Sequence, residues 1–100
     1  MALVFVKNGK VELRKESGSL IHTFGTGKTI NANINSDFSL IILTLAGGKV
    51  ELRKDSGSLV RTIGNGHCKS ASFAGDDILL ELENGKKELR KVSGSLIKTF

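Results

Sequence analysis

Apolar residues in this chain fall into short continuous runs and alternating segments, separated by turns rich in glycine. Each of three continuous runs is short and bounded by turn residues, which predicts strands buried on both faces. The runs lie at 3–6, 40–45 and 78–82, the third interrupted by Glu81. A pair of turn residues follows each run, and such pairs favour type I′ hairpins because both central residues take positive φ. The pairs are Asn8-Gly9, Gly47-Gly48 and Asn84-Gly85.

The segments between these runs alternate between apolar and polar residues. Val11 and Leu13 alternate with Glu12 and Arg14, which predicts a strand with one apolar face, and 50–53 repeats the pattern. A Ser-Gly-Ser turn then leads into a further strand, at 20–24, 59–63 and 96–100. Another alternating strand is expected at 30–34, with its counterpart at 69–73. No window carries a sustained helical stripe, so the chain is expected to be all-β.

The chain also repeats itself. Residues 11–20 recur at 50–59 and again at 87–96, with spacings of 39 and 37 residues. A four-stranded antiparallel meander repeated every 40 residues or so is typical of a β-propeller blade. The chain begins at the second strand of its first unit, so we expect eleven strands, or about 2.75 blades. The expected blades cover residues 1–25, 26–64 and 65–100.

The stretch 48–63, Gly-Lys-Val-Glu-Leu-Arg-Lys-Asp-Ser-Gly-Ser-Leu-Val-Arg-Thr-Ile, resembles the third and fourth strands of a WD40-type blade. Arg53-Lys54 stands where that family usually has Trp-Asp, and Gly66-His67 is the one Gly-His pair. The resemblance spans nearly the whole chain and is specific for the blade. It implies a short WD40-like propeller of bacterial type, used as a non-enzymatic scaffold or protein-interaction module.

Three blades are too few to close a propeller ring within one chain. Propeller rings start at about four blades, and an open arc would expose apolar blade faces that monomers avoid. We therefore expect a homo-oligomer, most simply a dimer that completes a six-bladed ring. The expected interface residues are Leu3, Val4, Phe5, Ile97 and Phe100. A β-trefoil, which closes three four-stranded repeats within one chain, is the alternative fold and would give a single-chain binding protein.

Composition and the apolar runs indicate the cellular compartment of the protein. Cys68 is the single cysteine among 100 residues, which excludes an internal disulfide framework and favours a reducing compartment. The N-terminal apolar run is too short for a signal peptide, and no run approaches the roughly 20 apolar residues of a membrane span. The expectation is a cytoplasmic protein without membrane contact.

The formal net charge of +5 permits a second hypothesis, in which the chain binds nucleic acid or another polyanion. Repetition places basic residues at equivalent ends of three strands, which a ring would arrange in a circle that contacts phosphates. They are Arg14, Lys15, Arg53, Lys54, Arg90 and Lys91. The lack of Trp and Tyr argues against base stacking. Each Arg also has a Glu two residues earlier on the same strand face, which predicts a surface ion pair.

No residues suggest catalysis, a cofactor or a metal. The segment 25–29, Gly-Thr-Gly-Lys-Thr, resembles the end of a phosphate-binding loop but lacks the earlier glycine and the following helix. His22, His67 and Cys68 are too few for a metal site, and Ser-Gly-Ser recurs three times as turns do. Asp37, Asp76 and Asp77 are expected to stabilise turns. The sequence therefore predicts a non-enzymatic protein whose particular partner it leaves open.

Overall fold

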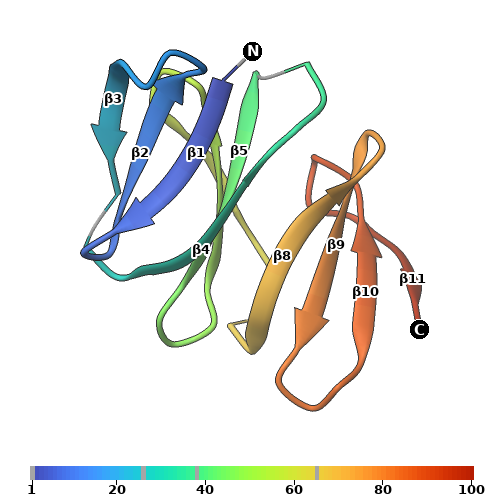
Figure 1. Cartoon of the computed structure of the whole chain (residues 1–100). Coiled ribbons are helices and arrows are strands. Elements are labelled where there is room, and N and C mark those ends of the chain that lie inside the picture. The colour runs from blue at the N-terminus through green and yellow to red at the C-terminus, as the bar shows by residue number, and fades with distance from the viewer. Residues whose placement is uncertain (1, 26, 38, 65) are drawn as a thin grey trace.

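The computed structural model describes residues 2–25, 27–37, 39–64 and 66–100, which form three antiparallel sheets standing side by side (Figure 1). We call these sheets blades 1, 2 and 3. Blade 1 contains β1 (Ala2–Lys7), β2 (Lys10–Lys15) and β3 (Leu20–Phe24). Blade 2 contains β4 (Thr29–Ile34), β5 (Leu40–Leu45), β6 (Val50–Lys54) and β7 (Leu59–Ile63). Blade 3 contains β8 (Cys68–Ala74), β9 (Asp77–Leu82), β10 (Lys87–Arg90) and β11 (Leu96–Thr99).

Each blade is a meander in which consecutive strands pair. Blades 2 and 3 have four strands, whereas blade 1 has three, in the order β1-β2-β3. The predicted all-β meander, its eleven strands and the missing innermost strand of the first unit are thus confirmed for the described part of the chain. Because the three units form three separate sheets, the β-trefoil alternative is wrong.

The middle blade is buried on both faces. On β5, Ile41 and Leu43 point toward blade 1 and pack with Val11, while Ile42 points toward blade 3 and packs with Leu80. Side chains alternate between the two faces of a strand, so one apolar strand contributes to both cores. The expectation of burial on both faces is confirmed for 40–45, where five consecutive residues are buried.

The two outer blades are buried on one face each, so the same expectation is wrong for 3–6 and 78–82. In β1, Val4 packs toward blade 2, whereas Leu3 and Phe5 point outward and are 40% and 47% exposed. In β9, Ile78 and Leu80 are buried against blade 2. These strands are buried on one face only because blades 1 and 3 stand at the two ends of the row of blades, which we call the arc, where no described residues cover their outer faces.

The hairpin turns also differ between blades. Asn8 and Gly9 have φ of 54° and 77°, so the predicted type I′ turn is confirmed there. The two later hairpins are one residue longer, closed by Gly48 N–H donating to Leu45 O and Gly85 N–H donating to Leu82 O. Asn84 does not take positive φ. The type I′ prediction is therefore wrong at these hairpins, because three residues and not two connect the strands; Gly47 and Gly48 both take positive φ in the first loop, and Gly85 does so in the second.

Candidate interaction surfaces

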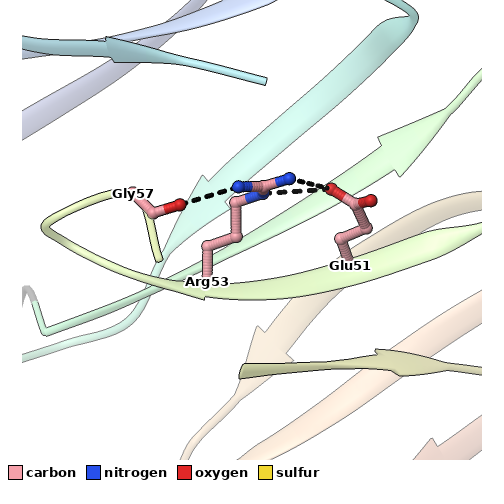
Figure 2. Close-up of polar contacts among 3 residues, drawn as sticks. All are labelled: Glu51, Arg53 and Gly57. Carbon is pink, nitrogen blue, oxygen red and sulfur yellow. Dashed lines mark hydrogen bonds and ion pairs between the residues drawn. The ribbon is translucent and has the colours of Figure 1, made fainter. Parts of the chain in front are cut away.

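A three-residue contact, which we call the Glu-Arg clasp, recurs in every blade. In blade 2, Arg53 donates to Glu51 Oε1 from Nε at 3.0 Å and from Nη2 at 2.9 Å, and to Gly57 O from Nη1 at 2.7 Å (Figure 2). The guanidinium thus joins a strand to the Ser-Gly-Ser turn that follows it. The equivalent clasps are Glu12, Arg14 and Gly18 in blade 1, and Glu88, Arg90 and Gly94 in blade 3.

The clasp lies on the blade face that points toward the preceding blade. Arg53 stands opposite Ile41 in the sheet register and Glu51 opposite Leu43, so the ion pair shares its face with the core between blades 1 and 2. The Arg53 and Glu51 side chains are 15% and 14% exposed, whereas Arg14 in blade 1 is 31% exposed. The predicted ion pairs are confirmed, but those of blades 2 and 3 are mostly buried, with 12–18% of each side chain exposed, and do not lie on the surface. Because a partly buried charge depends on its partner, loss of one member is costly.

The clasps determine which residues of the predicted basic circle are available to bind a polyanion. Its three arginines are held by carboxylates and turn carbonyls, which leaves Lys15, Lys54 and Lys91 as the exposed members. Glu16 and Asp55 follow two of these lysines directly in the sequence. The polyanion hypothesis at these positions stays a prediction, and it depends on the lysines.

The outer face of blade 1, called here the first end face, consists of Leu3, Phe5, Glu12 and Arg14. Leu3 and Phe5 occupy the positions that Ile41 and Leu43 occupy in blade 2, where both residues are fully buried beneath blade 1. The first end face thus repeats the composition of an internal blade interface, an apolar pair beside a Glu-Arg clasp.

The outer face of blade 3 forms the second end face. Its residues are Leu79, Glu81, Lys87, Leu89 and Phe100. They match a set of blade 2 residues that are buried against blade 3: Ile42, Thr44, Val50, Leu52 and Ile63. Phe100 is 61% exposed. The charged residues of the two end faces differ: Glu12 and Arg14 match the clasp of blade 2, whereas Glu81 and Lys87 stand where Thr44 and Val50 are buried.

The five predicted interface residues lie in four different places. Leu3 and Phe5 lie on the first end face and Phe100 on the second; Ile97 is 43% exposed on β11, the outermost strand of blade 3. Val4 instead packs against the core between blades 1 and 2. Sequence reasoning missed Leu79 and Leu89, which alternation within 78–82 and 87–90 would have placed on one face.

Two of the remaining candidate residues, Cys68 and Asp37, have structural roles. Cys68 is buried in the core between blades 2 and 3, and burial raises the pKa of its thiol, which keeps it protonated at neutral pH. Ser39 donates hydrogen bonds from its hydroxyl and backbone N–H to Asp37, which lowers the pKa of that carboxyl and fits the expected turn role. The segment 25–29, which resembles the end of a phosphate-binding loop and whose residue 26 lies outside the described residues, is followed by a strand and not by a helix: β4 begins directly after Lys28.

Among the described residues, His, Cys, Asp and Glu side chains nowhere form a group of three that could hold a metal ion. The described segments also contain no helix with the length and apolarity to cross a membrane.

Solved structures share this arrangement of blades. The chain superposes on BamB from Moraxella catarrhalis with a TM-score of 0.79 and 14% identity, over 99% of this chain and 32% of that one. It superposes on the C-terminal WD40 domain of Sif2 with a TM-score of 0.74 and 18% identity, over 99% of this chain and 33% of that one. No family model and no curated protein sequence matches the chain. The chain therefore has a WD40-like β-propeller repeat fold and spans about a third of the length of these two neighbours.

Proposed function

We propose that this chain is a non-enzymatic, propeller-type interaction module whose two end faces bind each other between copies, so that two copies assemble into a closed ring of six blades. One observation carries the proposal. Positions that are buried at the two internal blade interfaces are exposed at both ends of the arc, including Leu3, Phe5 and Phe100. Each large apolar side chain that becomes buried contributes about 1.5–3 kcal/mol.

The ring geometry adds to this apolar contribution. A two-copy ring contains two identical junctions, each pairing the first end face of one copy with the second end face of the other. After the first junction forms, the second is intramolecular and adds affinity without a further loss of translational freedom. Closure under a twofold axis also leaves no end face uncovered, which prevents open filaments.

The charged pair on the second end face is compatible with such a junction. Glu81 and Lys87 are direct neighbours across β9 and β10, so they can pair with each other when the face is covered. Desolvating this pair offsets part of the apolar gain. We therefore expect a weaker junction than the internal interface between blades 2 and 3.

Mixing two disabled variants tests the head-to-tail arrangement. Phe5→Asp disables the first end face and Phe100→Asp disables the second, so neither variant should assemble alone. Their mixture retains one intact junction and should form a two-chain species, measured by sedimentation velocity. Leu59→Asp is the matched control, because Leu59 is an exposed apolar residue on the middle blade, 52% exposed, away from both end faces.

The outcomes separate the possible arrangements. Assembly of the Leu59→Asp variant and of the mixture, but of neither end-face variant alone, supports the proposal. If Phe100→Asp alone assembles as the wild type does, the contact joins two copies of the first end face and the head-to-tail proposal fails. Circular dichroism of each variant confirms that a lost assembly is not a lost fold.

A further inference from the structure

A set of lysines along one edge of the three blades takes no part in the clasps, and only Lys87 among them also lies on an end face. The three hairpin turns β1–β2, β5–β6 and β9–β10 lie along the same end of the molecule, the lower side of Figure 1. Six exposed lysines stand in these turns, at their flanking strand ends or in the segment before β4, and we call them the lysine rim. They are Lys7, Lys10, Lys28, Lys49, Lys86 and Lys87.

Backbone hydrogen bonds hold these segments together across the blades. Thr29 N–H donates to Gly9 O at 2.9 Å and Ala46 N–H to Lys28 O at 2.7 Å, which fixes the segment with Lys28 between the turns of blades 1 and 2. Cys68 N–H donates to Gly48 O at 3.0 Å, and Glu83 N–H to His67 O at 2.9 Å, in the same way one blade further on. The rim is thus one continuous edge that runs across all three blades.

Charge on this edge is strongly one-sided. The turns, their flanking strand ends and the connecting segments of this edge carry the six lysines and two carboxylates, Glu83 and Glu81, of which Glu81 stands opposite Lys87 in the sheet. Within the described residues, none of the six lysines lies within ion-pair distance of a carboxylate. The opposite end of the blades has three lysines and five carboxylates: Lys15, Lys54, Lys91, Glu16, Asp37, Asp55, Asp76 and Asp77.

The rim is also hollowed at equivalent places. Lys28 and Lys49, with Leu45 and Glu51, line an open hollow of about 350 Å³. The equivalent hollow in blade 3, about 280 Å³, is lined by His67 and Glu83, among others. The segments 7–10, 28–29, 46–49 and 83–86 contain none of the large apolar residues that are exposed on the described surface. Charge is therefore the main feature by which this edge can recognise a partner.

From this arrangement we propose that the lysine rim binds the phosphate backbone of nucleic acid, independently of base sequence. A row of flexible lysines without apolar anchors suits a linear polyanion that has a regular charge repeat, and each phosphate contact releases counterions. The chain has no Trp or Tyr, which removes the usual stacking platforms for bases. This inference does not depend on ring assembly, because one copy carries the whole rim.

The test compares two triple variants with the same net charge. Lys28→Glu, Lys49→Glu and Lys86→Glu reverse the rim, and the matched control reverses Lys15, Lys54 and Lys91 at the opposite end. Fluorescence anisotropy with a labelled single-stranded oligothymidylate of about 20 nucleotides measures affinity between about 50 and 200 mM salt. We expect wild-type affinity to fall steeply with salt, and the rim variant to bind at least about tenfold more weakly than the control variant.

Each alternative result overturns the inference. Equal losses in the two triple variants would mean general attraction to net charge, and a larger loss in the control would move the site to Lys15, Lys54 and Lys91. Absence of a complex with the wild type at low salt, or equally tight binding of poly-glutamate, would exclude nucleic acid as the preferred partner. If the rim variant does not fold, the Lys→Gln triple at the same three positions replaces it, with the corresponding Lys→Gln control.

Discussion

Blade 2 and its two neighbours are built from nearly the same repeat, yet they differ in how much of each is buried. Blade 2 has apolar cores on both faces, whereas blades 1 and 3 each bury one face and expose the other. The same position is Leu43, fully buried, in blade 2 and Phe5, 47% exposed, in blade 1. The contrast shows that the repeat encodes a two-sided unit, and that a neighbour on each side determines whether both sides contribute to stability.

The largest expected effect comes from truncating the two-sided core. Leu43→Ala should reduce the free energy of unfolding by about 2–5 kcal/mol, because it removes a fully buried side chain and leaves a cavity. The equivalent change Phe5→Ala should cost much less when the first end face is uncovered. Urea unfolding in a Phe100→Asp background, which keeps that face uncovered, measures both. Equal losses would contradict the distinction between inner and outer blades.

The next effect concerns two glycines at equivalent turn positions. A Cβ on Gly48 would clash with the backbone oxygen of Gly66, whereas a Cβ on Gly85 would meet nothing within 4 Å, because no blade follows blade 3 among the described residues. Both glycines have positive φ, so alanine costs about 1 kcal/mol at either site. Gly48→Ala should cost about 2 kcal/mol more, since a backbone contact must give way. Thermal unfolding of the two variants compares them, and identical shifts would disprove the close approach.

A smaller effect is expected at the clasps. Glu51→Gln removes the charge that pairs with Arg53, which is 15% exposed, and should cost about 1–2 kcal/mol. Glu12→Gln makes the same change beside Arg14, which is 31% exposed and has no blade over it, and should cost about half as much or less. Chemical denaturation in a Phe100→Asp background, which keeps the first end face uncovered, measures both losses. A greater loss at Glu12 would show that blade packing does not strengthen the clasp.

The smallest effect concerns Cys68, which only the interface between blades 2 and 3 buries. Burial raises the pKa of its thiol in the folded state. The stability linked to this thiol is therefore complete below the ordinary thiol pKa and is lost as the pH rises from there toward the raised value. Unfolding measured across that alkaline range should show a decline that Cys68→Ala lacks. A parallel decline in both proteins would assign it to other groups.

Much of this fold follows from the sequence because strand alternation and glycine turns are local signals. The repeat at 11–20, 50–59 and 87–96 is sufficient to predict blades, strand order and the missing innermost strand. The length of the later hairpins was not predictable from Gly47-Gly48 and Asn84-Gly85 alone. Register there depends on whether Leu45 pairs one residue earlier or later, which packing between blades decides.

The surfaces were harder to predict than the strands. The pairing of Glu51 with Arg53 is local and was predicted, but its burial depends on blade 1 and was not. Exposure of Leu3 and Phe5 depends on which neighbour is absent, a property of the arc and not of the run itself. The lysine rim was not predicted from the sequence, because its members come from different turns and from a connecting segment, and only the fold brings them to one edge.

The central claim is that uncovered blade faces at the two ends of the arc bind each other, and the mass of the wild-type chain in solution tests it most directly. Light scattering after size exclusion, across a micromolar concentration series, measures that mass. We predict a species of twice the 10.7 kDa chain mass, which dissociates to the single chain on dilution. A single chain of 10.7 kDa at every concentration, with a cooperative fold, would contradict it.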